Sequence, residues 1–448
     1  MLNSSSENIV IVGAGLAGAL LACLLGKAGH EVAVYERRPD PREKGFLGGR
    51  SINLALSARG IHALSLAGLA ERVLNEAISM RGRMIHSVAG RLSFQPYSTN
   101  PRDAINSVSR GGLNEALLKK ASGYAGVRYY FEHRCVGVDL ERPAVTLSAA
   151  ENRTVDADVV IGCDGAFSAV RGEMQRLDRF DCAHTYLEHG YKELTIPPAA
   201  DGGFAMEPHA LHIWPRGGFM MIALPNRDRS FTCTLFWPFA GPRSFEAVRS
   251  ADDILRFFGV HFPDALALMP ALAEEYLRNP IASLVTVRCA PWFHRDRVVL
   301  VGDAAHAIVP FYGQGMNAAF EDCVVLAESL DLFPHDRQVA LQRYYGLRKT
   351  DADAIGDLAI ANFLEMRDRV ASPLFRLRKK SERVLHRLLP RWYTPLYNMV
   401  SFSRIPYAQA RRRATQQRRI VVAILTVLLL LAVIGVVWLF LVLIAKST

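Results

Sequence analysis

The sequence predicts an α/β protein in which a Rossmann-like domain is joined to an antiparallel sheet, a helical region and one C-terminal transmembrane helix. Three observations predict this fold class. A β-branched run at residues 8–12 leads directly into a glycine-rich turn and a helical stretch. Residues 185–240 alternate between apolar and polar positions and are interrupted by Pro and Gly, as in an antiparallel sheet. Residues 420–445 form a run of 26 positions without a charge.

The first predicted element is a βαβ unit built around a glycine-rich turn. Gly13-Ala-Gly15-Leu-Ala-Gly18 follows the first strand, and a second apolar run ends at Glu36. The glycines would let the backbone approach a pyrophosphate at the helix N-terminus, and the Glu36 carboxylate would accept hydrogen bonds from ribose hydroxyls. The alternative is a tight turn without a ligand. The preceding strand and the acid 18 residues after Gly18 favour a dinucleotide site.

A β-hairpin is predicted over residues 83–97. Arg83 and Tyr97 each lie seven residues from Gly90, so symmetric pairing would place them opposite each other on one face. A guanidinium beside a phenol can bind a carboxylate through charge-assisted hydrogen bonds. An ordinary surface arginine is the alternative, and the hairpin alone does not decide between the two.

Two later buried strands each lead into an aspartate. Residues 158–161 precede Gly162-Cys-Asp164-Gly165, and residues 298–301 precede Gly302-Asp303. Because Asp303 follows a buried strand, we expect it at the carboxyl edge of the sheet, where α/β proteins bind ligands. A helix N-cap is the alternative for Asp303.

Helical patterns follow the second of these strands. Residues 310–315 open a helix whose apolar positions keep a helical spacing. We interpret His306, which precedes it, as a hydrogen-bonded core histidine. Farther along, Asn362 and the residues three and four positions later share one helix face, which either lines a pocket or is an ordinary mixed face.

Three of these segments together resemble the class A flavoprotein aromatic hydroxylases. They are GAGLAG at 13–18, CDGAFSAVR at 163–171 and LVGDAAHAIVPFYGQGMNAAFED at 300–322. Further segments, spread over nearly the whole chain, resemble the members of this family that act on L-kynurenine. Those segments are residues 49–56, 80–86, 107–110, 189–198, 211–216, 362–367, 395–397 and 402–405. The resemblance implies bound FAD and, because no second glycine motif is present, an NADPH co-substrate that docks transiently.

The resemblance and the glycine motif together assign the expected site residues. The cofactor contacts are expected at Gly13, Gly15, Ala17, Gly18, Tyr35, Glu36, Arg37, Arg38, Ala55, Arg110, Cys135, Asp164, Ala169, Asp303, Gly315, Met316 and Asn317. The contacts at Cys135 and Ala169 are expected through the backbone. The amino-acid end of the substrate is expected on Arg83, Tyr97, Asn362 and Tyr397. The helix that opens at Gly315 would stabilise negative charge on reduced flavin.

The reaction implied by the resemblance is hydroxylation of L-kynurenine to 3-hydroxy-L-kynurenine, in tryptophan degradation and NAD biosynthesis. NADPH would reduce FAD, and O2 would form a flavin C4a-hydroperoxide that transfers oxygen to the ring carbon ortho to the amine. That amine supplies the electron density, so no catalytic protein base is assigned. Two alternatives stay open: a hydroxylase of another aromatic acid, and a membrane-tethered flavin-binding redox protein without hydroxylase activity.

The net charge of +10 is concentrated in one region. Residues 374–419 hold 13 Lys and Arg against a single acid, Glu382, and so carry +12. Lys446 adds one, which leaves −3 for residues 1–373. A slightly acidic body with a basic region before an apolar tail suits anionic lipid headgroups, and we expect no nucleic acid partner.

The seven cysteines are odd in number and well separated, without a C-x-x-C pair or a Cys/His cluster of zinc spacing. We therefore expect free thiols in a reducing compartment and no bound metal.

The apolar tail predicts a membrane anchor. As a helix, residues 420–445 would measure about 39 Å, more than a hydrocarbon core of about 30 Å. Arginines precede this run and only Lys446 follows it, so the body is expected in the cytosol, on a mitochondrial outer membrane or a bacterial inner membrane. The basic segment 375–387 either rests on an anionic membrane surface or is a charged helix packed on the body.

The expected domains follow from these elements. Residues 1–75, 100–180 and 285–345 would form a discontinuous FAD-binding domain, and residues 76–99 and 181–284 a sheet that covers the substrate. Residues 346–419 would complete the pocket with helices, before the transmembrane helix 420–445. No oligomeric state is predicted.

Overall fold

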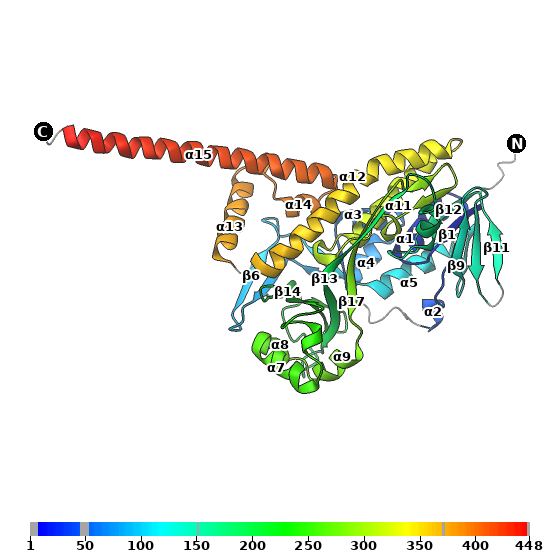
Figure 1. The fold of residues 1–448 in the computed structure, drawn as a ribbon, viewed down its shortest axis with the longest axis horizontal. Coiled ribbons are helices and arrows are strands. Elements are labelled where there is room, and N and C mark those ends of the chain that lie inside the picture. Colours follow the sequence, from blue (N-terminus) through cyan, green and yellow to red (C-terminus); the bar gives the residue numbers. More distant parts are fainter. Residues whose placement is uncertain (1–7, 45–52, 150–151, 370–371, 446–448) are drawn as a thin grey trace.

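The fold is given by a computed structural model, which describes residues 8–44, 53–149, 152–369 and 372–445. Part of the predicted segment 49–56 and the flanking charge of Lys446 lie outside the described residues. Two large sheets form the body, and helices cover them (Figure 1).

The first large sheet has the strand order β18-β19-β12-β1-β2-β8. Its strands are β1 (Asn8–Val12), β2 (Glu31–Tyr35), β8 (Val127–Tyr130), β12 (Val159–Gly162), β18 (Phe293–His294) and β19 (Val298–Leu300). All of them pair in parallel except β18 with β19. The central strands are buried along nearly their whole length, as expected for parallel strands covered on both faces. The predicted Rossmann-like sheet is confirmed.

The second large sheet has the order β17-β13-β16-β15-β14-β5-β6. Its strands are β5 (Gly82–His86), β6 (Leu92–Pro96), β13 (Asp181–Ile196), β14 (Ala210–Pro215), β15 (Met220–Pro225), β16 (Phe231–Pro238) and β17 (Ala282–Ala290). The predicted antiparallel arrangement holds for every pair but one, because β5 and β14 are parallel. More than a hundred residues separate these two strands, enough chain for the crossover that parallel pairing requires. The sheet is therefore mixed.

The hairpin of β5 and β6 has a different register from the predicted one. Arg83 pairs with Gln95, not with Tyr97. The turn is tight, with hydrogen bonds between Ser87 and Arg91, so the centre of the hairpin falls at residue 89 and not at Gly90. The predicted direct opposition is wrong. Tyr97 lies two positions beyond Gln95, which makes it a diagonal neighbour of Arg83 on the same face.

Smaller sheets and helices complete the body. The order β3-β7-β4 joins β3 (Asn53–Leu56), β4 (Ile78–Met80) and β7 (Ile105–Ser109), and β11-β10-β9 joins β9 (Arg134–Asp139), β10 (Ala144–Ser148) and β11 (Arg153–Asp156). The helices before residue 300 are α1 (Leu16–Lys27), α2 (Pro41–Lys44), α3 (Ala58–Leu66), α4 (Ala70–Glu76), α5 (Arg110–Ala121), α6 (Ala169–Met174), η1 (Phe245–Ala247), α7 (Ala251–His261), α8 (Pro263–Leu266) and α9 (Leu272–Arg278). The expected domain boundaries stay a proposal.

The C-terminal third is helical, as predicted. Its elements are α10 (Asp303–His306), η2 (Pro310–Tyr312), α11 (Gly315–Leu332), α12 (Arg337–Leu364), a π-helical turn η3 (Glu365–Arg369), α13 (Pro373–Leu388), α14 (Leu396–Ser401) and α15 (Tyr407–Ala445). Helix α15 projects from the body as one continuous rod of 39 residues (Figure 1). It is the one described helix whose length and apolar composition suit a membrane span.

The first turns of α15 are part of the core. Tyr407 is fully buried, and the centre of its ring lies 3.8 Å from the guanidinium carbon of Arg59. Its hydroxyl donates to Gln314 Oε1 at 2.9 Å, in the turn that precedes α11. Arg59 also donates to the carbonyls of Val400 and Ile405. These contacts fix the start of α15 on the body.

Candidate functional site

The glycine-rich turn joins β1 to α1, and its three glycines have different roles. Gly13 has a φ of +102°, and a Cβ there would lie 2.6 Å from the Cys163 carbonyl oxygen. A Cβ on Gly18 would lie 1.9 Å from the Gly13 carbonyl oxygen. A Cβ on Gly15 would meet nothing within 4 Å. Gly13 and Gly18 are therefore needed for the turn itself, whereas Gly15 borders open space at a helix N-terminus, where a pyrophosphate fits.

Glu36 closes the other side of this space. One carboxylate oxygen accepts a hydrogen bond from the Ala14 N–H and the other from the Arg38 N–H, each at 2.9 Å. Gly15, Glu36 and Arg38 share one hollow with Arg110, which begins α5. Two exposed guanidinium groups beside the free N–H groups of a helix suit a phosphate-containing ligand.

Tyr35, Arg37 and Ala17 lie around the same turn. The Tyr35 ring is buried and stacks on Tyr130 at 4.8 Å, so the side chain belongs to the core. Arg37 is exposed and Ala17 is half-buried on the first turn of α1.

Asp164 lies at the end of β12 and organises the start of α6. One of its carboxylate oxygens accepts from the Ala169 N–H at 2.7 Å, and the other is buried without a hydrogen-bond partner among the described residues. Desolvation raises the pKa of this carboxyl above its usual range, despite the hydrogen bonds it accepts. Cys135 on β9 is close by, and burial, helped by the charge of Asp164, raises the pKa of its thiol to about 12. The unpartnered oxygen of Asp164 leaves an acceptor for a ligand donor.

Asp303 is the first residue of α10, at the carboxyl end of β19. Its side chain is accessible, yet surrounding protein desolvates it and raises the pKa of its carboxyl. Both properties hold for a side chain that lines an internal hollow. His306 is instead a buried core histidine, hydrogen-bonded through Nε2 to Asp322, as the sequence predicted.

Asn317 lies in the first turn of α11, and its side chain is fully occupied within the protein. Nδ2 donates to the carbonyls of Ala55 at 2.8 Å and Gly313 at 2.9 Å, while Oδ1 accepts from the Ser57 N–H at 2.9 Å. These bonds tie the turn before α11 to β3. The groups left for a cofactor here are the backbone N–H groups that begin the helix at Gly315, with the half-buried Met316 beside them.

The substrate residues predicted from three distant segments form one cluster. The rings of Tyr97 and Tyr397 are stacked, with 5.0 Å between the ring centres and an angle of 17° between their planes. The Arg83 guanidinium carbon lies 5.1 Å from the centre of the Tyr397 ring and 5.8 Å from that of Tyr97. The fold therefore brings residues of β5, the end of β6 and α14 together.

Arg83 is buried without a carboxylate partner. Only 8% of the residue is exposed, its Nε has no hydrogen-bond partner, and no ion pair to it is present among the described residues. Burial alone would lower the pKa of the guanidinium, but the neighbouring Tyr397 and Tyr97, together with the Glu365 carboxylate, raise it above its usual value. Burial also raises the pKa of both tyrosines, so their hydroxyls stay protonated. A buried cation beside two hydroxyl donors is arranged to receive an anion from outside.

Asn362 reaches the same region from α12. Its Nδ2 donates to the Phe311 carbonyl at 2.7 Å and lies 3.3 Å from the Met366 sulfur. The Phe311 ring stacks on Phe363 at 4.1 Å. Asn362 thus holds the turn at η2. This turn lies between the start of α11, on the expected flavin side, and the cluster of Arg83, Tyr97 and Tyr397.

Comparison with known proteins places this arrangement in a family. The FAD binding domain family matches residues 7–349. The kynurenine 3-monooxygenase of Myxococcus xanthus is 48% identical over 413 residues, which cover 92% of this chain and 89% of the relative. The chain belongs to the kynurenine 3-monooxygenase family. The kynurenine 3-monooxygenase of Sus scrofa is 46% identical, over 91% of this chain and 86% of its own length.

A solved structure of another protein shares the fold. Pseudomonas aeruginosa PqsL in complex with 2-aminobenzoylacetate has a TM-score of 0.64 and 26% sequence identity. The match covers 81% of this chain and 97% of that chain. The fold class predicted from the sequence, a FAD-binding monooxygenase fold of α/β type, is confirmed.

Sequence reasoning missed one member of the cluster. Tyr312, in η2, stacks on Tyr397 at 5.6 Å and is buried. It lies in the segment 310–315, which also belongs to the resemblance to the class A flavoprotein aromatic hydroxylases, but that segment predicted only the start of a helix. An aromatic residue in the turn next to a predicted cofactor helix was the available signal.

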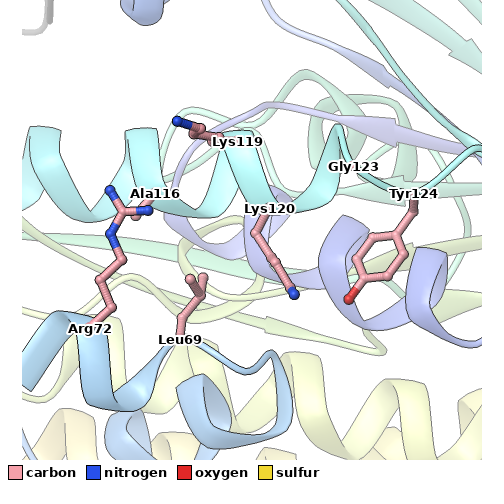
Figure 2. A pocket seen from close by; sticks show the side chains of 7 residues that line it. All are labelled: Leu69, Arg72, Ala116, Lys119, Lys120, Gly123 and Tyr124. Carbon is pink, nitrogen blue, oxygen red and sulfur yellow. The ribbon is translucent and has the colours of Figure 1, made fainter.

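A separate hollow of about 270 Å³ lies between α4 and α5 (Figure 2). It is lined by Leu69, Arg72, Ala116, Lys119, Lys120, Gly123 and Tyr124. None of the residues predicted for the cofactor or the substrate lines it, so it is not the site expected in a kynurenine 3-monooxygenase.

Proposed function

We propose that this chain is a FAD-dependent monooxygenase that uses NADPH and O2 to hydroxylate L-kynurenine to 3-hydroxy-L-kynurenine. Membership of the kynurenine 3-monooxygenase family supports the reaction. The observation that carries the substrate is Arg83, a buried guanidinium without a carboxylate partner among the described residues. The α-carboxylate of an amino acid is the partner that this arrangement lacks.

The cofactor contacts predicted from the sequence are retained in this proposal. The open space at Gly15, the acceptor Glu36 and the two exposed arginines, Arg38 and Arg110, suit the adenosine diphosphate part of FAD. Asp303 and the N-terminus of α11 would lie beside the flavin ring. FAD, when bound, supplies the activation of O2 and the transfer of one oxygen atom.

The remaining work of this chain is to hold and shield the substrate. Arg83, Tyr97 and Tyr397 would bind the carboxylate, with Asn362 holding the adjoining turn. Buried aromatic rings, among them Phe236 and Phe311 at 4.8 Å from each other, would keep water from the reacting atoms. The amine of the substrate ring supplies electron density, so no protein base is required. PqsL binds 2-aminobenzoylacetate, which carries the same 2-aminobenzoyl group as kynurenine.

The test of this function is a coupled measurement on the purified full-length protein. NADPH oxidation should rise when L-kynurenine is added, and 3-hydroxykynurenine should form in step with it. Kynuramine, which lacks the α-carboxylate, is the matched control and should bind much more weakly. Bound flavin without NADPH oxidation stimulated by L-kynurenine would contradict the proposal and favour a redox protein without hydroxylase activity.

We further propose that residues 420–445 anchor the protein in a membrane, with the body in the cytosol. The composition and exposure of this part of α15 support the proposal. Deleting residues 420–448 should release the protein from membranes, because no other described helix meets the length and hydropathy of a span. Full-length protein should stay in the membrane fraction through a high-salt wash, since a spanning helix is insensitive to screening. A truncated protein that also resisted salt would show that another segment anchors the chain.

A further inference from the structure

Helix α13 has an apolar stripe that points away from the body. At 3.6 residues per turn, Leu377, Val384 and Leu388 fall within about 40° of one another around the helix axis. All three are exposed, Leu388 by 70% and Leu377 by 64%. On the opposite side, Phe375 is buried in the body and His386 bonds to the Tyr393 carbonyl. The described residues leave this stripe uncovered.

Basic side chains border the stripe on both sides. Lys380 and Arg387 lie on one side of it and Arg378, which is also paired with Glu365 and Glu382, lies on the other; all three are exposed. Residues 376–391 contain seven Lys and Arg against the single acid Glu382. An apolar stripe between rows of cations is the pattern of a helix that lies in the surface of an anionic bilayer.

One hydrogen bond sets the position of α13 relative to the predicted span. Gln417 on α15 donates from Nε2 to the Trp392 carbonyl at 2.7 Å. Gln417 precedes the uncharged run by three residues, which is about 4.5 Å along a helix. The partly exposed Trp392 therefore lies level with the start of the apolar segment, where tryptophan is favoured at membrane surfaces.

The orientation of α13 is consistent with a position at the membrane surface. Helix α13 lies crosswise to α15 instead of running along it (Figure 1). If α15 crosses a bilayer, a crosswise helix at its point of entry runs along the bilayer surface.

We propose that α13 and the following residues 389–392 form a membrane-docking surface whose partner is the anionic headgroup layer of the bilayer. The proposal rests on the proposed anchor at 420–445. Because the anchor holds α13 beside the lipid, docking is intramolecular and needs little affinity of its own.

The docking surface borders the substrate cluster. Arg378 lies 3.6 Å from Glu365 in the π-helical turn that follows α12. In the sequence, Tyr397 lies between Trp392, which would contact the membrane, and the start of α15, which is fixed on the body. The proposal therefore places the amino-acid end of the pocket at the membrane side of the protein.

The test uses full-length protein in nanodiscs of phosphatidylcholine alone or of phosphatidylcholine mixed with phosphatidylglycerol. Trypsin cleavage within residues 376–391 is followed by mass spectrometry. We expect several-fold slower cleavage in the anionic discs, and high salt should remove this protection without releasing the protein. Equal cleavage in the two kinds of disc would overturn the proposal.

Matched variants distinguish a loss of membrane docking from a loss of folding. The triple variant Leu377→Gln, Val384→Gln and Leu388→Gln should lose the protection. The double variant Leu255→Gln and Val260→Gln, which changes exposed residues of α7, should keep it. Retained flavin absorbance shows that each variant is folded.

A second measurement does not depend on the triple variant. Lipids brominated near the headgroup should quench the fluorescence of Trp392. The contribution of Trp392 is the part of the quenching that disappears in the Trp392→Phe variant. Absence of this component would overturn the proposal, as would protection that depends on the number of protein copies per disc, because a second copy would then cover the stripe. Failure of the full-length protein to enter discs would refute the anchor and the docking surface together.

Discussion

The cofactor half and the substrate half of the molecule use opposite means to prepare a binding site. Around Gly13 to Glu36, the site is made by missing side chains and backbone N–H groups, and a Cβ added at Gly15 meets nothing. Around Arg83, the site is made by buried side chains, and the Arg83 Nε has no hydrogen-bond partner among the described residues. The first half can fold without its ligand at little cost in free energy, whereas the second buries a guanidinium that has no ion pair among the described residues. Substitutions should therefore affect the two halves differently.

The largest effect is expected for Gly15→Val. The valine side chain enters the space proposed for the pyrophosphate without clashing with the protein, so the variant should fold but contain almost no FAD. The measurement is the flavin-to-protein absorbance ratio, with circular dichroism to confirm folding. Gly18→Val is the contrast, because its Cβ would lie 1.9 Å from the Gly13 carbonyl oxygen and the turn cannot form. Full flavin occupancy in Gly15→Val would refute the site.

Arg83→Met should separate binding from stability. Loss of the charge-assisted contact should raise the KM for L-kynurenine by some tens of fold, about 2–3 kcal/mol, with flavin content unchanged. Because the guanidinium is buried without an ion pair among the described residues, the melting temperature should stay the same or rise. Kynuramine lacks the carboxylate, so its KM should change little. Equal losses for kynurenine and kynuramine would contradict the carboxylate role.

A pH effect of intermediate size is expected in the substrate half. Burial lowers the pKa of His212 from 6.5 to about 4, so the native state holds this ring neutral while the unfolded chain protonates it. The resulting stability is present above pH 6.5 and is lost as the pH falls towards 4. Between pH 6.5 and pH 5 the loss is about 2 kcal/mol. In urea unfolding, the free energy of unfolding of His212→Asn should not show this fall between pH 6.5 and pH 5. The variant His209→Asn, which changes an exposed histidine, should still show it.

The smallest effects are expected for Tyr97→Phe and Tyr397→Phe. Each removes one hydroxyl donor and keeps the stacked ring, so the KM for L-kynurenine should rise roughly fivefold, about 1 kcal/mol. Since the pKa of both tyrosines is raised, substrate affinity of the wild type should not fall between pH 7 and pH 9 through their ionisation. Steady-state kinetics over this range measures both expectations.

The same contrast explains what the sequence could predict. The turn from Gly13 to Gly18 is a local pattern, so its place between a strand and a helix followed from the neighbouring residues alone. Arg83 and Tyr97 could be placed on one hairpin face, but the register depended on a tight turn that Gly90 alone did not specify. Tyr312 reaches Tyr397 through tertiary packing across about 85 positions, which no local spacing records. The hydrogen bond from the Asn317 side chain to the Ala55 carbonyl could not be predicted for the same reason.

The buried start of α15 has a consequence for how the molecule moves. Tyr407 is locked against Arg59 and Gln314, and the helix continues without a break to Ala445. The 13 residues from 407 to 419 therefore act as a spacer of fixed length, about 20 Å, and not as a loose tether. If residues 420–445 span a membrane, as proposed, this spacer keeps the body at one height and one tilt above the lipid and leaves it free to rotate about the membrane normal. One residue inserted between 411 and 419 would then turn the whole body by about 100° relative to the membrane-spanning segment, and so change the side that faces the bilayer.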